Sequence, residues 1–351
     1  FNFYKICRIM KIGVTGASGM VGINVCNEII SNGHKLNILL RDDVDYLDKL
    51  DCNKFYGDLN NINILEKFCE KCDVIIHSAA MISIGLDSYD KVYDVNFVGT
   101  RNLIEASVRE KVKKFIFIST VNAFNKKPTD KKFDETRDLV RKGNAYDMTK
   151  ALAQDLVLNT EGIDSISINP TSVLGKNDFK PSRLGKIIKG VYSGNLPLLV
   201  DGGLDIIDVE DLSKAIYNSI SKGKDGEAYL ISGKWRSFKE MYEIIRPLQE
   251  KKSKVFFFPK TIVELSLPLL SIFPVGILKK ITHISGKFFP GLENMTKEAI
   301  ENIINFPKKI DNSKAKRDLG LKISSLKKTI KDSIYELSLI HISEPTRPEE
   351  I

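Results

Sequence analysis

The stretch Lys11-Ile-Gly-Val-Thr-Gly-Ala-Ser-Gly-Met-Val-Gly22 decides the fold. Its first five residues form an apolar, β-rich run, and a helical pattern begins at Met20. Because glycine lacks a Cβ, it lets the chain turn tightly and lets a pyrophosphate approach the backbone. The first amides of the following helix would point at the phosphates. The stretch therefore predicts a dinucleotide-binding turn that includes Gly16, Ser18, Gly19, Met20 and Val21.

Strand and helix patterns alternate after this turn. The predicted strands are Lys11–Thr15, Leu36–Leu40, Lys54–Tyr56, Val74–His77, Phe115–Ser119 and Ser165–Asn169, and the predicted helices are Met20–Ser31, Ile62–Lys71, Tyr89–Arg109 and Ala145–Asn159. Near-continuous apolar strands separated by helices are typical of a parallel sheet covered on both faces. We therefore predict an α/β fold, a doubly wound parallel Rossmann sheet with a smaller, mostly helical C-terminal substrate lobe.

The lengths of the predicted strands and helices change along the chain, and this change sets the expected domain boundaries. Residues 10–176 should form the dinucleotide-binding domain, and residues 205–232 should return to it. Shorter elements follow Gly175, so 177–204 and 233–336 should form the substrate-binding lobe.

The two ends are treated separately. Met10 stands immediately before the first strand, so we expect residues 1–9 to be an upstream extension, with a short native extension as the alternative. Leu337–Arg347 back-translates to a sequence that resembles a transposon-based sequencing adapter. We therefore expect 337–351 to be an adapter-derived tail, outside the fold.

Composition excludes several classes of protein. Hydrophobic residues at 42% and charged residues at 28% exclude a wholly disordered or fibrous chain. The net charge is +8, but the lysines are scattered, so we expect no nucleic-acid partner. The five cysteines are an odd number without a recognisable secretory signal, which favours free thiols and a cytoplasmic location. The spacing Cys69-Glu-Lys-Cys72 has no second ligand pair, so we expect no metal site.

An apolar, proline-punctuated run extends from Thr261 to Leu292. Its densest part, Ile262–Leu278, is interrupted by Glu264 and two prolines and falls short of the roughly 20 apolar residues that a membrane-spanning helix needs. We expect helices that line an apolar substrate pocket. Peripheral membrane contact through 261–292 is the alternative.

The end of the second predicted strand bears on the choice of dinucleotide. An acid at this position binds a ribose 2′-hydroxyl, whereas an arginine accommodates a 2′-phosphate. Here Leu40 is followed by Arg41 and Asp42. We therefore expect NADP(H) to be preferred, with NAD(H) as the alternative through Asp42.

A second constellation carries acid–base chemistry. Tyr146 and Lys150 are four residues apart and share one helix face, and Thr120 follows the fifth predicted strand. A lysine ammonium near a phenol favours the phenolate and lowers the phenol pKa from about 10. Tyr146 would then exchange a proton with a substrate oxygen that Thr120 hydrogen-bonds. These three residues are the predicted catalytic group.

Over roughly residues 10–336 the chain resembles an extended short-chain dehydrogenase/reductase of the NAD-dependent epimerase/dehydratase group. The stretches that carry the resemblance are Thr15–Gly22, Gly57–Leu59, His77–Ala80, Asn96–Asn102, Tyr146–Lys150, Asn169–Gly175 and Asp208–Asp211. Within the group the chain most resembles dihydroflavonol-reductase-like and 3β-hydroxysteroid-dehydrogenase-like members. Thr120 stands where the group usually has Ser, which keeps the hydroxyl.

The resemblance implies further cofactor contacts. Asp58 and Leu59 would flank the adenine, and Ala79 and Ala80 would lie along the cofactor. Lys150, with Tyr146 beside it, would hold the nicotinamide ribose. Residues from Pro170 to Val173 would pass the nicotinamide face.

Hydride transfer between NAD(P)H and a carbonyl or secondary alcohol of a small, apolar substrate is the expected function. A nucleotide-sugar epimerase using the same Tyr and Lys, and a non-catalytic dinucleotide-binding protein, are the alternatives. Dehydration is disfavoured because Val121 and Asn122 follow Thr120, where a dehydratase has an acid pair. The oligomeric state stays open. Members of the group often pair through helices equivalent to Tyr89–Arg109 and Ala145–Asn159, so the resemblance implies these helices as the contact of a possible homodimer.

Overall fold

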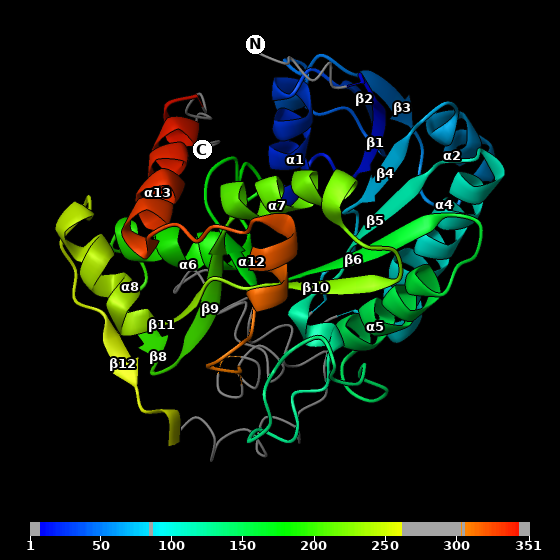
Figure 1. Cartoon of the computed structure of the whole chain (residues 1–351). Helices are drawn as coiled ribbons and strands as arrows, with labels where there is room; N and C mark the ends of the chain where they lie inside the picture. Colours follow the sequence, from blue (N-terminus) through cyan, green and yellow to red (C-terminus); the bar gives the residue numbers. More distant parts are fainter. Residues whose placement is uncertain (1–7, 84–86, 262–302, 304–305, 344–351) are drawn as a thin grey trace, which may run out of the picture.

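A seven-stranded, wholly parallel sheet forms the centre of the molecule (Figure 1). The computed structural model describes residues 8–83, 87–261, 303 and 306–343, with side chains as far as residue 335. The strand order is β10-β6-β5-β4-β1-β2-β3. The strands are β1 Lys11–Thr15, β2 Lys35–Leu40, β3 Asn53–Tyr56, β4 Val74–His77, β5 Lys114–Ile118, β6 Asp164–Pro170 and β10 Glu227–Ile231. The order reverses between β1 and β4, which creates the crevice where such sheets bind ligands.

Helices cover both faces of this sheet, as predicted. One core layer lies under α1 Met20–Ser31, α7 Val209–Lys222 and α12 Ser313–Leu319. The other lies under α2 Ile62–Cys69, α4 Gly99–Arg109 and α5 Ala145–Leu158. The predicted doubly wound α/β fold is therefore confirmed. Short 3-10 turns occur at η1 Asp45–Leu47, η3 Val121–Ala123 and η4 Arg246–Leu248.

The helix predicted over 89–109 is interrupted. It consists of α3 Tyr89–Tyr93, a π-helical segment Asp94–Val98 (η2) and α4. The Thr100 hydroxyl donates to the Asn96 carbonyl at 2.6 Å, four residues back, and this bond accompanies the widened turn.

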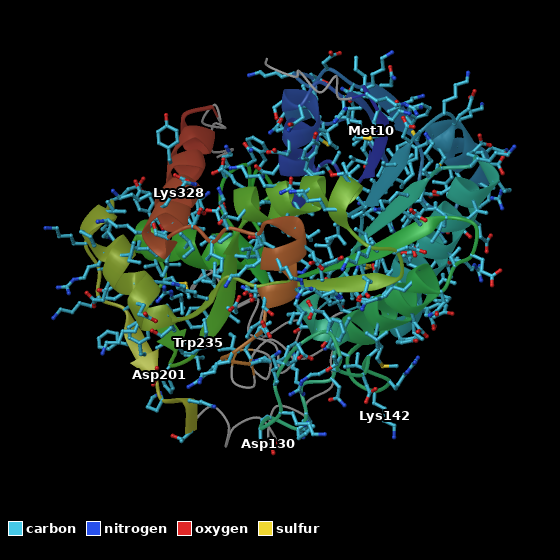
Figure 2. The ribbon with its side chains drawn as sticks, in the orientation of Figure 1. Met10, Asp130, Lys142, Asp201, Trp235 and Lys328 are labelled. Atoms are coloured by element: carbon cyan, nitrogen blue, oxygen red, sulfur yellow. The ribbon has the colours of Figure 1, made fainter. Side chains whose placement is uncertain are left out.

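A second lobe contains two small sheets as well as helices. The three-stranded sheet has the order β11-β9-β7 and the two-stranded sheet pairs β12 with β8. The elements are β7 Ser172–Leu174, β8 Leu198–Val200, β9 Gly203–Asp208, β11 Lys234–Ser237, β12 Phe256–Phe258, α6 Arg183–Tyr192, α8 Phe238–Ile245 and α13 Leu326–Ser343. Trp235 and Asp201 lie in this lobe, far from Met10 (Figure 2). After β9, the chain returns to the main sheet through α7 and β10.

The acidic stretch 208–211 joins the lobe to the main sheet. Asp208 caps α7 by accepting from the Glu210 amide at 2.8 Å, and its other oxygen accepts from the Thr329 hydroxyl at 2.7 Å. Lys328, on α13 (Figure 2), donates to Glu210 at 2.7 Å. These bonds fix α13 against α7.

Two predictions fall wholly or partly outside the described residues. The structure describes only Thr261 of the apolar run 261–292. The predicted pocket helices and the alternative membrane contact therefore lie outside the described residues. At the chain ends, 1–7 and 344–351 are likewise outside, whereas residues 337–343 of the predicted tail continue the helix α13. Among the described helices, none combines the length and the apolar character needed to cross a bilayer.

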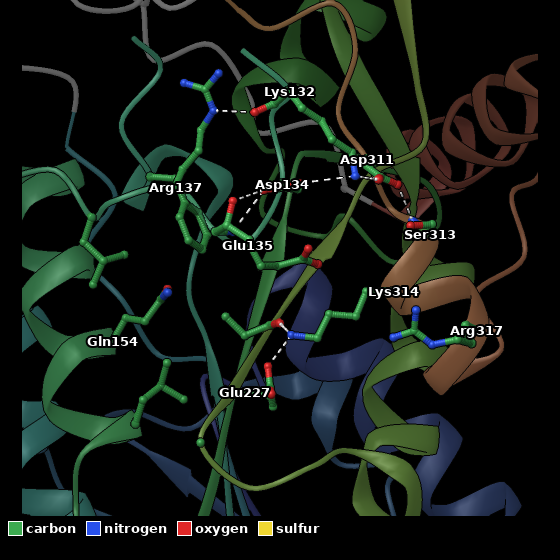
Figure 3. Close-up of a pocket in the computed structure, with 16 residues that line it drawn as sticks. Lys132, Asp134, Glu135, Arg137, Gln154, Glu227, Asp311, Ser313, Lys314 and Arg317 are labelled. Atoms are coloured by element: carbon green, nitrogen blue, oxygen red, sulfur yellow. Dashed lines mark hydrogen bonds and ion pairs between the residues drawn. The ribbon is translucent and has the colours of Figure 1, made fainter. Parts of the chain in front are cut away.

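Side chains close the free edge of β10. Lys314 donates to the Ala228 carbonyl at 2.6 Å, and Glu135 accepts from the Leu230 amide at 2.8 Å. Just past the strand, Asn312 donates to the carbonyl of Ser232 at 2.7 Å. Glu135, from the loop before α5, and Lys314, at the start of α12, line a cavity of about 460 Å³ (Figure 3). The edge is therefore covered rather than open to another strand.

We predict that Lys314→Met destabilises the protein by about 1–3 kcal/mol, because the Ala228 carbonyl and the Glu227 carboxylate both lose a charged partner. Urea unfolding measures the change. Lys316→Met is the control, since Lys316 is exposed on the same helix, and should change stability by less than about 0.5 kcal/mol. Equal effects of the two substitutions would contradict the role of Lys314.

Candidate functional site

The predicted site residues gather at one edge of the main sheet. Because the strands are parallel, their carboxyl ends meet at this edge (Figure 1). The residues that follow or end successive strands are Gly16 to Val21 after β1, Arg41 after β2, Asp58 and Leu59 after β3, Ala79 and Ala80 after β4, Thr120 after β5, Pro170 at the end of β6, and Val173 in β7. The structure therefore brings these predicted residues to one side of the sheet.

The turn after β1 has the backbone that a phosphate requires. Gly16 has φ +73°, and a Cβ there would lie 2.6 Å from the Ala79 nitrogen. A Cβ on Gly22 would lie 2.1 Å from the Gly16 carbonyl oxygen. None of the described side chains caps the start of α1, so its first amides remain available to an anion. The turn fits the pyrophosphate of a dinucleotide.

Arg41 lies at the position that distinguishes the two dinucleotides. It is exposed, as is Asp42, and none of the described residues forms an ion pair with it. Asp43 is already engaged, because it accepts from the Tyr56 hydroxyl at 3.0 Å and from Lys54 at 3.4 Å, and these bonds lower the pKa of its carboxyl. The Arg41 guanidinium therefore remains available for a phosphate.

The loop after β3 is held by α4. The Leu59 carbonyl accepts from Asn102 at 3.0 Å, and a Cβ on Gly99 would lie 2.8 Å from the Leu59 side chain. Asp58 accepts from the Asn60 amide at 2.9 Å, which shapes the turn. The stretch 96–102 thus fixes the loop that the resemblance assigns to the adenine.

Asn96, from the same stretch, orders the loop after β4. Its Oδ1 accepts from the Met81 amide at 2.7 Å, and its Nδ2 donates to the Met81 carbonyl at 3.0 Å. The Nδ2 also donates to the Thr149 hydroxyl at 3.2 Å. Sequence reasoning quoted Asn96 within a motif but gave it no role, although a buried asparagine beside a loop is the signal that could have found it.

Thr120 and Tyr146 meet at the centre of the site. The Thr120 hydroxyl lies near enough to lower the pKa of the Tyr146 phenol, and the Thr120 oxygen accepts from the Asn122 amide at 3.2 Å. Burial raises the pKa of Tyr146 above its usual value, and the negative charge of Asp147 adds to the rise. Arg183 and the hydrogen bond with Thr120 oppose it. Tyr146 is therefore a protonated phenol at neutral pH.

Lys150 is buried and points to the end of β5. Its Nζ donates to the Ile118 carbonyl at 2.6 Å and lies 4.0 Å from the centre of the Phe117 ring. Burial lowers the pKa of this ammonium to about 7. The sequence predicted that Lys150 would acidify Tyr146, but the cation that favours the phenolate in this structure is Arg183. The reason is the Ile118 carbonyl, which holds the Lys150 ammonium.

Sequence reasoning missed two ionisable residues beside Tyr146. Arg183 begins α6 and donates from Nη2 to the Ile82 carbonyl at 3.1 Å. Asp147 is buried and accepts from Asn144 at 2.9 Å through Oδ2, while its Oδ1 makes no hydrogen bond with any described residue. Burial raises the pKa of the Asp147 carboxyl. Arg183 carries no motif signal, because its place depends on how the lobe packs.

Other buried polar atoms near Thr120 have spare hydrogen-bonding capacity. Ser119 Oγ and Asn122 Oδ1 make no hydrogen bond within the described part of the chain. Such atoms are costly unless a ligand or water satisfies them. Together with the open turn after β1, they fit a site that holds a nicotinamide dinucleotide and a polar substrate atom.

The cysteine pair is part of the hydrophobic core. Cys69 and Cys72 are buried free thiols, and burial raises their pKa to about 12 and about 11. Within the described residues, no group of three or more His, Cys, Asp or Glu side chains is placed to hold a metal ion.

Two curated relatives cover nearly the whole chain, and a third covers about two thirds of it. The sterol demethylase protein B of Methylococcus capsulatus is 26% identical over 326 residues, 92% of this chain and 96% of that protein. A dihydroflavonol 4-reductase-like protein of Synechocystis is 25% identical, over 92% of this chain and 93% of its own length. The 3 beta-hydroxysteroid dehydrogenase/Delta 5→4-isomerase of Mycobacterium tuberculosis is 25% identical over 68% of this chain and 69% of its own.

Solved structures share the fold. The crystal structure of gox2253 matches with a TM-score of 0.77 at 24% identity, over 93% of this chain and 98% of that one. The UDP-glucose 4-epimerase of Thermotoga maritima matches with a TM-score of 0.72 at 18% identity, over 94% and 99%. The model of the NAD dependent epimerase/dehydratase family matches residues 12–232. With this match and the geometry of the site, the chain belongs to the NAD-dependent epimerase/dehydratase family and is an enzyme of the extended short-chain dehydrogenase/reductase type.

Proposed function

We propose that this enzyme transfers a hydride between NADP(H) and the carbonyl or secondary alcohol of a small, apolar substrate. The observation that carries the proposal is that Thr120, after β5, and the buried phenol of Tyr146, on α5, come together at the carboxyl edge of the sheet, where Thr120 lowers the pKa of the phenol. Support for an apolar substrate comes from relatives that are named for sterols, dihydroflavonols and hydroxysteroids.

The cofactor would lie across the strand ends. The turn Gly16–Val21 would bind its pyrophosphate, and Arg41 would pair with the 2′-phosphate through its planar fork. Lys150 would hold the nicotinamide ribose, while Pro170 and Val173 would border the nicotinamide. When bound, the nicotinamide ring accepts or supplies the hydride.

Tyr146 supplies the proton in the direction of reduction. Its raised pKa keeps the phenol protonated, which suits a general acid. The Thr120 hydroxyl donates a hydrogen bond to the same substrate oxygen and so stabilises the charge that develops there. Arg183 favours the phenolate that remains after the proton leaves.

The epimerase alternative uses the same residues without net oxidation or reduction. Its support is likeness to solved sugar epimerases, such as that of Thermotoga maritima at 18% identity. At this identity the likeness concerns the fold, so it does not favour a sugar substrate over an apolar one.

Tyr146→Phe tests the acid. We expect kcat to fall by about 10²–10⁴-fold, because the phenol that donates the proton is lost, while the Kd for NADPH changes little. Tyr217→Phe, on α7, is the matched control and should keep full activity. Steady-state kinetics on a panel of steroid and flavonoid ketones, with fluorescence titration of NADPH, measures both quantities. Unchanged turnover in Tyr146→Phe would contradict the mechanism.

Deuterated NADPH separates reduction from epimerisation. With a ketone from the panel, we expect deuterium in the alcohol product and one NADP⁺ formed for each alcohol. Interconversion of UDP-sugars at constant cofactor absorbance would instead establish the epimerase and overturn the proposal.

Arg41→Ala tests the choice of cofactor. NADPH should bind the unmodified enzyme more tightly than NADH, and the substitution should weaken NADPH binding by about 10- to 100-fold by removing a charge-assisted pair. NADH binding should be little changed. Asp42→Asn is the companion variant and should leave the preference intact. If the unmodified enzyme binds the two cofactors equally, the preference for NADP(H) is wrong.

Lys150→Met should stabilise the cofactor-free protein more at about pH 6 than at about pH 9. Burial lowers the pKa of Lys150 to about 7, whereas an unfolded lysine has a pKa of about 10.4. The cost of the buried ammonium is therefore complete below pH 7 and is relieved as the pH rises toward 10.4. In urea unfolding, the gain in unfolding free energy from Lys150→Met should be about 2–3 kcal/mol larger at pH 6 than at pH 9. Equal gains at both pH values would show that Lys150 keeps an ordinary pKa.

A further inference from the structure

One outer face of the substrate lobe combines lysines with phenylalanines. Burial alternates along residues 252–258, as expected for an extended chain whose neighbouring side chains point to opposite sides. Lys252, Lys254, Phe256 and Phe258 are exposed, and we call this set the β12 face. Between them, Val255 is buried and Phe257 packs edge-on against Tyr242 with ring centres 5.9 Å apart.

The two phenylalanines of the β12 face are unusually open. Phe256 is 67% exposed and Phe258 is 45% exposed. β12 lies at the outer edge of the lobe and pairs with β8 along one side, so its outward face lies on the surface (Figure 1). Single exposed apolar residues are ordinary, but two adjacent phenyl rings on one strand face indicate a contact surface.

The charge around the β12 face is positive. Residues 249–260 include four lysines and one acid, Glu250. Neither Lys252 nor Lys254 forms an ion pair with a described residue. A second acidic residue, Asp201, lies beside Phe258, because its backbone amide donates to the Phe258 carbonyl at 2.8 Å. The partner should therefore carry negative charge above an apolar layer.

We propose that the β12 face docks on a lipid bilayer that contains anionic headgroups. Lysines attract such headgroups, and their flexible stems let the charge stay in water while the chain lies on the apolar layer. The phenyl rings enter the boundary between headgroups and acyl chains. A stacking surface for single-stranded nucleic acid needs a basic groove that follows the backbone, and this flat strand face provides none among the described residues.

This surface goes beyond the proposed reaction and stands independently of it. A bilayer is where an apolar substrate accumulates, and docking would place the substrate lobe against that source. Vesicle binding is measured without turnover. The docking proposal can therefore hold if the reductase proposal fails, and the reductase proposal can hold if the protein does not bind vesicles.

Sedimentation with sucrose-loaded vesicles tests the docking surface on the full chain. We expect binding to vesicles of phosphatidylcholine mixed with phosphatidylglycerol, weaker binding as salt increases, and little binding to phosphatidylcholine alone. Each lysine near an anionic surface contributes about fivefold in affinity. Lys252→Glu with Lys254→Glu should therefore reduce binding by more than about 25-fold.

A matched control separates the β12 face from total charge. Lys67→Glu with Lys316→Glu makes the same change in net charge at exposed positions on α2 and α12, away from β12 (Figure 1). This control should keep binding within about threefold. Phe256→Ser with Phe258→Ser should reduce binding by at least about tenfold at unchanged salt dependence. Thermal melting of each variant shows that it is folded.

Four results would overturn the proposal. The first is an unmodified protein that does not bind the mixed vesicles at low salt. The second is equal loss of binding in the control and in the lysine pair of the β12 face. The third is binding of a single-stranded RNA, lost in the β12 variants, without vesicle binding. The fourth is a dimer that the phenylalanine substitutions dissociate while vesicle binding stays unchanged, which would make this face a contact between two copies.

Discussion

The close approach of the turn after β1 to the end of β4 is the constraint on which the site depends. It is possible because Gly16 has no Cβ, since a methyl group there would lie 2.6 Å from the Ala79 nitrogen. Gly22 lets α1 pack on the same turn, because a Cβ there would lie 2.1 Å from the Gly16 carbonyl oxygen. The Thr15 hydroxyl reinforces the contact by accepting from the Ala79 amide at 3.3 Å. Since β1 and β4 are the strands between which the order reverses, this contact sets the width of the crevice.

A series of buried hydrogen bonds connects the turn after β1 to α5, the helix that bears Tyr146. His77 lies fully buried between the Thr15 hydroxyl at 2.6 Å and the Thr100 hydroxyl at 2.9 Å. Burial, with the charge of Lys150, lowers the pKa of His77 to about 3, so the imidazole stays neutral and acts as a link. The Thr100 hydroxyl donates a hydrogen bond to the Asn96 carbonyl, and the Asn96 side-chain amide donates one to the Thr149 hydroxyl on α5. Satisfied buried networks of this kind hold their members in one arrangement.

Sequence patterns predicted the parts of the fold that local chemistry decides. The bounds of β1, β4 and α1 agree with the prediction to the residue, because apolar runs end at glycine or polar residues there. The strand ends then located the motif residues, since parallel strands share one edge. Long-range packing decided the rest. The pairing of β12 with β8, and the return of α12 to cover the edge of β10, join segments far apart in the sequence and leave no periodic signal.

The environment of Tyr146 shows why a catalytic motif does not fix the acidity of its own tyrosine. Helical spacing places Lys150 on the same face as Tyr146, but the Ile118 carbonyl holds the ammonium, and spacing contains no information about that bond. Two other charges act on the phenol with opposite signs. Asp147, on α5, raises its pKa, and Arg183, at the start of α6, lowers it. One charge comes from the helix that bears the tyrosine and the other from the substrate lobe. Burial is the main cause of the raised pKa of Tyr146, and the packing of the lobe against the main sheet moderates it through Arg183. Enzymes with the same motif and different lobes can therefore hold this proton with different strength.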